Sequence, residues 1–366
     1  MLRLKIVAIG AALGVLLTGV VGAQSGPSAS GLLSPRHIAY DASGTLWIAE
    51  AGAGGDVATD GPLGPALAGL TGQVSTLGTD GTQAVYASNL PSMNWGFDEI
   101  VGVHAAVPVD DLLYLVVGNG GGDATGSLGR GLVLWDMESE SIAVSLDTLA
   151  AESALNPDGE IIDSNPMDIA FAPDGTIYLA DAGANTVWRV VPGVAELQVF
   201  AAWTDNPVPT SVEVDSEGSV YVGFLSGFPH VEGSARVEKW SSSGTLVETI
   251  SGLTAVVDLA MDSTGLYAVE YGRYGDNGFI PATGQVVRVD PAGTQPVATG
   301  LNYPFGLALS PSGVWMVSFD TSFANAPGNG RVGSLEDAAA AGAQVPQIAP
   351  TATEEVVPAA TAEVSG

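Results

Sequence analysis

A short apolar run with an aromatic residue at its second position recurs six times along the chain. Side chains of this kind favour extended backbone, so each run predicts a buried β-strand. The runs are residues 46–50, 113–117, 177–181, 220–224, 266–270 and 314–318. The chain is therefore expected to consist of a repeated β unit.

Further strands are expected around each run. An earlier apolar segment and a hairpin turn precede most runs, as at Pro173-Asp174-Gly175 and Pro311-Ser312-Gly313. A third strand is expected at 72–76, 131–135, 185–189, 235–239 and 284–288, and a fourth in segments such as 296–301. The aromatic residues of the last four runs lie 43 to 48 residues apart, a spacing typical of four-stranded propeller blades. We expect an all-β fold, a six-bladed β-propeller with four-stranded antiparallel blades.

The two ends of the repeat region complement each other. No clear fourth strand follows residues 331–335, whereas residues 28–32 resemble the fourth-strand segment 297–301. We expect the mature N-terminal strand to complete the sixth blade and close the ring. A solenoid would instead end in an atypical repeat at each terminus. One propeller domain is expected over residues 24–335.

The N-terminal residues have the pattern of a signal peptide. Arg3 and Lys5 precede an apolar run over 6–21, and small residues follow at 21–23. We expect cleavage after Ala23, a secreted or periplasmic protein and no stable membrane insertion after cleavage. The alternative is an uncleaved membrane anchor, since the run is nearly long enough to span a bilayer.

The last residues have a different composition. From 336 to 366 the chain is rich in Ala, Pro, Thr and Glu and contains no aromatic residue. Such a segment buries too little apolar surface to offset its ordering entropy, so we expect a disordered tail.

The formal net charge is −30, from 40 acidic and 10 basic residues. This charge repels phosphate backbones and anionic lipid headgroups, which argues against nucleic acid and membrane-surface partners. It favours cations, basic ligands or simply solubility. Cysteine is absent, so disulfides cannot contribute and stability depends on the core. Separately, we expect the protein to be a monomer.

Several longer motifs occur in the middle of the chain. They are Glu152 with 156–159, then 163–166, 181–185, 208–211, and 226–229 leading into 233–236. With these motifs the chain resembles the ScyD/ScyE family of exported, NHL-like β-propellers over most of residues 30–335. It departs from the family at 95–98 and at Phe224. The resemblance implies an exported propeller and implies little about activity.

In a propeller, the residues that open the first strand and end the second strand of each blade surround one mouth of the central channel. The first strands contribute His37, Glu99, Asp168, Ser211, Asp258 and Gly306, and the second strands contribute Glu50, Asn119, Asp181, Glu270 and Asp320. We take His37, Glu99, Asp168, Ser211 and Asp181 as candidate ligand-binding residues at this mouth.

Carboxylates dominate this set, and hard oxygen ligands suit Ca²⁺ or Mg²⁺. One hypothesis is a divalent cation held by Glu50, Asp168, Asp258 and Glu270, as in lactonase-type propellers. The alternative is that Asp181 and Glu270 only cap turns through hydrogen bonds to the backbone.

Two functions remain open at this point. The first is a non-catalytic scaffold that binds a small molecule or a protein through an acidic mouth. The second is a metal-assisted lactonase or lyase, in which a cation polarises a carbonyl and a carboxylate acts as base. The Gly-x-Ser-x-Gly signature of a serine hydrolase is absent.

Overall fold

The computed structural model describes residues 27–61, 64–95, 99–118, 128, 130–321 and 328–345. The predicted signal peptide and most of the predicted tail lie outside these residues. The described residues form antiparallel β-sheets and two short helices. No helix among them is both long enough and apolar enough to cross a bilayer.

Five of the described sheets have four strands each. One contains β8 (Val103–Val109), β9 (Leu112–Val117), β10 (Gly131–Asp136) and β11 (Ser141–Asp147). The next contains β12 (Pro166–Phe171), β13 (Ile177–Asp181), β14 (Thr186–Val190) and β15 (Gln198–Ala202). The third contains β16 (Pro209–Val214), β17 (Val220–Phe224), β18 (Ala235–Trp240) and β19 (Leu246–Leu253). The fourth contains β20 (Val256–Asp262), β21 (Gly265–Glu270), β24 (Gly284–Asp290) and β25 (Gly293–Leu301).

The fifth four-stranded sheet joins the two ends of the described chain. Its strands are, in order, β1 (Ala29–Leu32), β28 (Gly330–Ser334), β27 (Trp315–Phe319) and β26 (Leu307–Leu309). In the antiparallel pair of β1 and β28, Ala29 lies opposite Val332 and Ser30 opposite Arg331. An N-terminal segment therefore forms the outer strand of a sheet whose other strands come from the end of the chain.

The largest sheet departs from the four-stranded pattern. It contains β2 (Pro35–Tyr40), β3 (Leu46–Glu50), β4 (Val57–Gly61), β5 (Gly64–Leu77), β6 (Gln83–Asn94) and β7 (Ile100–Val101). The sequence predicted strands at 46–50 and 72–76 in this sheet; the first is β3, and β5 begins well before the second segment and pairs with β4. A separate two-stranded hairpin, β22 (Tyr274–Gly275) and β23 (Gly278–Phe279), follows β21.

The hairpin between β12 and β13 illustrates how the sequence specifies each repeat. The Gly175 amide donates to the Ala172 carbonyl at 2.9 Å, and the Asp174 carboxylate accepts from the Thr176 amide at 2.9 Å. Gly175 has φ +84°, a conformation that glycine adopts without strain. The turn thus sets the register in which Ile169 lies opposite Leu179.

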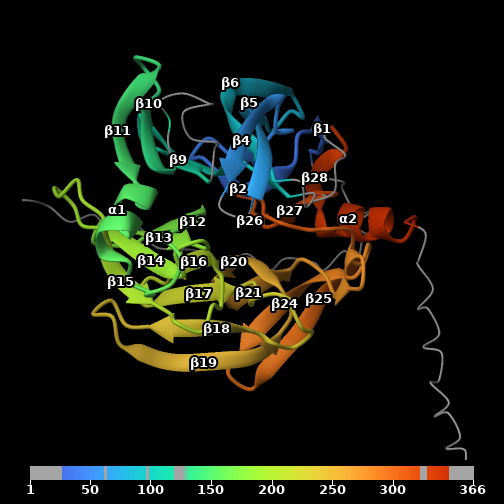
Figure 1. Ribbon diagram of the computed structural model, residues 1–366. Helices are drawn as coiled ribbons and strands as arrows, with labels where there is room; N and C mark the ends of the chain where they lie inside the picture. The colour runs from blue at the N-terminus through green and yellow to red at the C-terminus, as the bar shows by residue number, and fades with distance from the viewer. Residues whose placement is uncertain are drawn as a thin grey trace, which may run out of the picture.

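The innermost strands follow one another around the middle of the molecule (Figure 1). Contacts link β2 to β8, β8 to β12, β12 to β16, β16 to β20, β20 to β26 and β26 to β2. Side chains also bridge neighbouring sheets: the Thr210 hydroxyl of β16 donates to the Val256 carbonyl of β20 at 2.7 Å, and the Ser318 hydroxyl of β27 donates to the Arg36 carbonyl of β2 at 2.8 Å. Neighbouring sheets are therefore joined by polar contacts.

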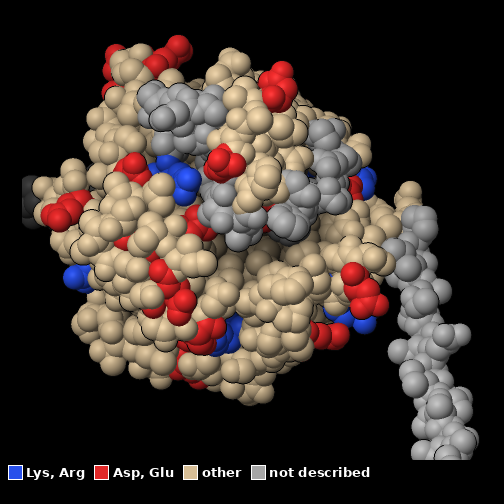
Figure 2. All heavy atoms as spheres, in the orientation of Figure 1, with Lys and Arg blue, Asp and Glu red and all other residues tan. Residues whose placement is uncertain are grey.

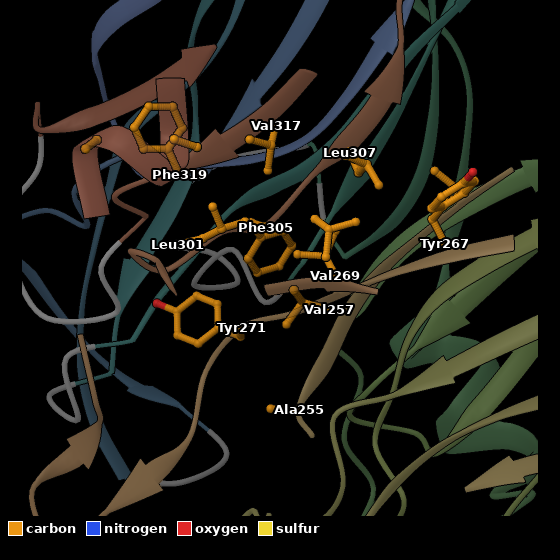
Figure 3. Packing of buried hydrophobic residues seen from close by; sticks show 14 of the residues in the cluster. Ala255, Val257, Tyr267, Val269, Tyr271, Leu301, Phe305, Leu307, Val317 and Phe319 are labelled. Atoms are coloured by element: carbon orange, nitrogen blue, oxygen red, sulfur yellow. The ribbon is translucent and has the colours of Figure 1, made fainter. Parts of the chain in front are cut away.

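Apolar side chains fill the spaces between neighbouring sheets. Figure 3 shows one such cluster, in which Phe305 lies among Leu301, Val257 and Val269, close to Tyr271. The side chains of Phe305 and Tyr271 are fully buried. Burial of such large side chains is the main source of stability in a chain without disulfides.

Helix α2 (Leu335–Gly342) differs from the disordered tail that the sequence predicted from residue 336. Ser334 and Asp337 form a reciprocal capping box at its start. Ala338 and Ala341 are buried in the cluster of Figure 3, and a Cβ on Gly342 would lie within 2 Å of the Gly300 carbonyl oxygen. Small side chains therefore let this segment dock closely, although an Ala-rich run of low complexity is typical of disorder.

We expect Ser334→Ala to lower the free energy of unfolding by about 1 kcal/mol, because it removes the N-cap of α2. The matched control is Ser216→Ala, a change at an exposed turn position. Urea denaturation of the three proteins measures the effect, and equal stabilities would show that docking of α2 does not contribute to folding.

Candidate functional site

The inner strands share one register position, which directly follows an irregularity in their pairing with the next strand. In β12, Pro166 lies opposite Asp181 and Asp168 opposite Ala180, so Met167 is an extra residue between the two pairs. The same irregularity occurs in β2, β8, β16 and β20. The residue after it, here called the inner-ring position, is His37, Ala105, Asp168, Ser211, Asp258 and, just before β26, Gly306.

Glu99 does not occupy this position, in contrast to the sequence prediction. The register places Ala105 there, and Glu99 lies before β7 in the connection that leads to β8. Strand β7 is an additional strand directly before β8, so Glu99 was taken for the residue that opens the first strand of this repeat. A signal for the right residue exists, because a turn glycine follows the inner-ring position by seven residues in five repeats, at Gly44, Gly175, Gly218, Gly265 and Gly313. In the remaining repeat, Leu112 stands directly before the run 113–117, as Gly265 and Gly313 stand before theirs, and the residue seven positions before Leu112 is Ala105.

Three inner-ring side chains meet at one point. His37 Nδ1 lies 3.0 Å from Asp258 Oδ1 and 3.7 Å from Asp168 Oδ1. One ligand atom from each residue lies within 4.8 Å of the others, and all three residues are buried. They come from β2, β12 and β20, which belong to three different sheets and lie far apart in the sequence, so only the tertiary structure brings them together. We call these three residues the inner cluster.

Backbone amides orient both carboxylates of the inner cluster. Asp168 accepts from its own neighbour Ile169 at 2.8 Å and from Val212 of β16 at 3.0 Å. Asp258 accepts from Leu259 at 2.8 Å and from Leu307 of β26 at 2.6 Å. Each aspartate therefore joins its strand to the next inner strand while one oxygen faces His37.

His37 carries the positive charge of the inner cluster. Burial alone would lower its pKa, but Asp168 and then Asp258 outweigh burial and raise the pKa to about 9. Burial raises the pKa of Asp168 to about 7 against the opposing attraction of His37. The imidazole edge packs on Phe305 with ring centroids 5.3 Å apart. His37 Nε2 accepts or donates no hydrogen bond within the described part of the chain.

A buried hydroxyl and a partly buried carboxyl on β16 also have unusual environments. The Ser211 hydroxyl is fully buried and has no hydrogen-bond partner among the described residues. Burial raises the pKa of Glu213 on the same strand to about 8, and the charges of Asp168 and Asp258 add to that effect. Glu213 was not among the residues predicted from the sequence, since nothing in the local pattern distinguishes it from a surface acid.

The residues beside the inner-ring position are structural. Arg36 is buried, donates to the Ile100 carbonyl at 2.7 Å and lies over the Phe305 ring at 4.9 Å. His104 Nδ1 lies 2.9 Å from the Pro166 carbonyl oxygen, and burial together with Arg36 lowers the pKa of His104 to about 3. His104 is therefore neutral at physiological pH.

Glu50 and Glu270 have partners of their own and lie outside the inner cluster. Glu50 accepts from the Leu33 amide at 2.5 Å and from Gln73 at 2.9 Å. Glu270 accepts from the Thr254 amide at 3.1 Å and from Gln285 at 2.7 Å. The four-carboxylate metal set predicted from the sequence is therefore not assembled in this geometry: only Asp168 and Asp258 of that set come together, and His37 joins them.

Asp181 is likewise a cap. Its carboxylate accepts from the Asn165 amide at 2.7 Å, the Ser164 hydroxyl at 2.8 Å and the Trp188 indole at 3.1 Å. This matches the alternative in which carboxylates at strand ends bind nearby turns. Phe224 takes the corresponding place on β17, and Asn119 lies outside the described residues.

Figure 2 shows acidic side chains spread over the face that it presents, with few basic ones, and a hollow near the middle beside grey atoms. This distribution agrees with the net charge of −30. The inner cluster is buried, so its charge is separate from this exposed acidic surface.

No protein-family model and no curated protein sequence matches the chain. Among solved structures, the chain is similar to a proposed oxidoreductase (glucose dehydrogenase) from Thermus thermophilus, at 14% identity over 83% of this chain and 97% of that one, with a TM-score of 0.54. It is also similar to a structural-genomics protein of unknown function from Bacteroides thetaiotaomicron, at 11% identity over 86% of this chain and 72% of that one, with a TM-score of 0.53.

At these identities the similarity shows the fold alone. Together with the antiparallel four-stranded sheets, it defines a β-propeller-type fold. The resemblance of the motifs between Glu152 and Arg236 to the ScyD/ScyE family stays a prediction.

The charge of His37 is directly measurable. In protein treated with a chelator, we expect the ring signals of His37 to titrate with a midpoint near pH 9, since Asp168 and Asp258 raise its pKa to about 9. Asp258→Asn should lower this midpoint by about 1 pH unit or more, because it removes one of the two stabilising charges. NMR titration is feasible because the sequence has 3 histidines. A wild-type midpoint near 6.5 would show that the inner cluster does not hold a charged imidazole.

Glu213 should make stability depend on pH. Its folded pKa of about 8 lies above its unfolded value, so this group stabilises the fold fully at pH values below the unfolded pKa, and the contribution is lost as pH rises toward 8. The difference in unfolding free energy between wild type and Glu213→Gln should therefore fall between pH 5 and pH 8, by up to about 1.4 kcal/mol per unit. Urea denaturation at several pH values measures it. The exposed Glu217→Gln variant is the control, and parallel curves for wild type and Glu213→Gln would contradict the assignment.

Proposed function

We propose that this protein is a ligand-binding propeller whose inner cluster of His37, Asp168 and Asp258 holds a divalent cation. The observation that carries the proposal is the convergence of the three side chains on one point, with a ligand atom from each within 4.8 Å of the others. Two carboxylates and one imidazole are a recognised kind of metal-ligand set that leaves further positions for water or a ligand.

The donor chemistry narrows the choice of cation. The carboxylates alone led to the expectation of Ca²⁺ or Mg²⁺. An imidazole nitrogen shifts the preference toward Mn²⁺ and Zn²⁺. Because a metal needs the neutral imidazole, a cation at this site displaces the proton that His37 otherwise holds.

The environment of the cluster also offers groups for a ligand. His37 Nε2 and the Ser211 hydroxyl are buried polar groups without a partner among the described residues. Buried polar groups gain from hydrogen bonds with a bound molecule. These groups would orient an oxygen-containing small molecule next to the cation.

The same proposal includes the architecture and the location. We take the six larger sheets as six blades and β1 as the strand that closes the ring, which the pairing of Ala29 with Val332 supports. We place the protein outside the cytoplasm, as an exported monomer of the ScyD/ScyE type, on the evidence of its N-terminal sequence and its motifs. An unidentified small molecule or protein would be its partner.

Glu213 favours a second candidate function, a metal-assisted lactonase or lyase. A partly buried carboxyl whose pKa is raised to about 8 can exchange a proton near neutral pH. In that function the cation would polarise a carbonyl of the substrate. Turnover of lactones or esters that is lost in Glu213→Gln would establish the enzyme, and binding without turnover would establish the scaffold.

Addition of Mn²⁺ or Zn²⁺ to chelator-treated protein should raise the midpoint of thermal unfolding. A cation at about 100 times its dissociation constant stabilises the native state by about 2.7 kcal/mol. We expect Asp168→Asn and Asp258→Asn to abolish the shift, because each removes one charged ligand. Asp111→Asn, a change at an exposed turn, should keep it. A shift that persists in both inner-cluster variants would place the cation elsewhere, and the absence of any shift in wild type would refute the metal site.

A further inference from the structure

Four aromatic side chains gather on two connections outside the inner cluster. Phe228 and His230 belong to the connection between β17 and β18, and Tyr274 and Phe279 belong to the hairpin of β22 and β23. The ring centroids of Phe228, His230 and Tyr274 lie 5.2 to 6.0 Å from one another, and the His230 ring stacks on Phe279 at 5.4 Å. We call these four residues the aromatic platform.

The aromatic platform is anchored on the buried core. The rings of Phe279 and Tyr271 pack edge to face with centroids 4.8 Å apart, and the Phe279 carbonyl accepts from the Tyr303 hydroxyl at 3.1 Å. Tyr271 is fully buried, and its hydroxyl donates to the Thr321 carbonyl at 2.6 Å. Rings that are already held in place lose little conformational freedom when a ligand binds.

The outer part of the aromatic platform faces solvent. Phe228 is 76% exposed, so at least one face of its ring is open. Val231 of the same connection is also exposed. Large apolar side chains that gather on the surface beside an ordered aromatic cluster are typical of a binding surface.

His230 offers a hydrogen-bond acceptor close to the open ring of Phe228. Its Nδ1 lies 2.8 Å from the Ser226 carbonyl oxygen, which can only accept, so Nδ1 carries the proton. Burial lowers the pKa of His230, which keeps the ring neutral. Its Nε2 receives no hydrogen bond from the described residues, so a ligand can donate to this nitrogen.

The charges around the aromatic platform favour a positively charged ligand. Glu232 lies two residues after His230, Asp276 lies in the turn of the β22–β23 hairpin, and both are exposed. Burial raises the pKa of Glu270 at the end of β21, and the charge of Glu232 adds to this effect, so negative charge gathers here. Arg273 is the one basic residue in the two connections. Electron-rich ring faces and nearby carboxylates both attract cations.

We propose that the aromatic platform binds a small organic ammonium ion that carries an N–H group. The open ring of Phe228 and its neighbours stabilise the positive charge through cation–π attraction. His230 Nε2 accepts the N–H group, and Glu232 and Asp276 add electrostatic attraction. A neutral molecule gains nothing from these charges. The platform contains no residue of the inner cluster, so this binding does not depend on a metal there.

Calorimetric titration of the full chain with three compounds of similar shape tests the proposal. They are trimethylammonium, which has a charge and an N–H group, tetramethylammonium, which has only the charge, and neutral tert-butanol. A chelator is present throughout, so failure of the proposed metal site does not affect the result. We expect trimethylammonium to bind about 10-fold more tightly than tert-butanol, because the site recognises charge. Tetramethylammonium should bind with intermediate affinity, since it cannot donate to His230.

Substitutions at Phe228 separate ring chemistry from apolar bulk. Phe228→Leu keeps an apolar side chain but removes the ring, so it should weaken binding of trimethylammonium about 10-fold and leave that of tert-butanol unchanged. Phe228→Tyr keeps the ring and is the matched control that should retain the affinity. Because Phe228 is mostly exposed, the midpoint of thermal unfolding should be the same in both variants, which separates loss of the site from loss of the fold.

The acceptor role of His230 has its own test. His230→Phe keeps an aromatic ring and removes Nε2, so it should abolish the preference for trimethylammonium over tetramethylammonium. Equal affinities for trimethylammonium and tert-butanol in wild type would overturn the proposal. Undiminished binding of trimethylammonium in Phe228→Leu, or no binding of either ammonium ion to wild type, would overturn it as well.

Discussion

The bridge that Asp168 and Asp258 make between neighbouring inner strands is the contact on which the centre of the molecule depends. Each carboxylate accepts an amide from its own strand and one from the next inner strand. The inner strands belong to different sheets and share no backbone hydrogen bonds. The hydrogen bonds to these carboxylates therefore fix how far each inner strand is shifted along its neighbour. Two buried carboxylates repel each other when both are ionised, and the positive charge of His37 opposes this repulsion from 3.0 Å to Asp258 and 3.7 Å to Asp168.

In the proposed function, this arrangement has both a structural role and a cation-binding role. As long as His37 is protonated, its positive charge offsets part of the carboxylate charge of the inner cluster. If a divalent cation replaces the proton, the same two carboxylates hold the metal and the strands remain bridged. Binding then requires no rearrangement of the backbone, because the amides of Ile169, Val212, Leu259 and Leu307 already orient the ligands.

The acidic residues of the chain fall into distinct kinds of environment. Glu50, Asp181 and Glu270 end their strands and bind turn amides, so their charge is neutralised by several donors. Asp168 and Asp258 face a histidine. Glu152 is buried and has no hydrogen-bond donor among the described residues. The physical distinction between cap, cluster and unpaired acid depends on donors, which the residue type alone does not reveal.

The sequence by itself determined the strands, the turns and the repeat. Aromatic β-branched runs and Pro-Asp-Gly turns act over a few residues, so local chemistry suffices to predict β13 and its hairpin. The sequence also placed His37, Asp168, Ser211 and Asp258 at one end of their strands. Only the tertiary structure decided which of them meet, because β2, β12 and β20 belong to different sheets and lie far apart in the sequence. The structure also shows that Ala105, and not Glu99, occupies the inner-ring position. The additional strand β7 lies before β8, so the start of β8 was not recognised in the sequence. The tertiary structure docked α2 as well, since burial of Ala338 and Ala341 depends on a surface formed by distant strands.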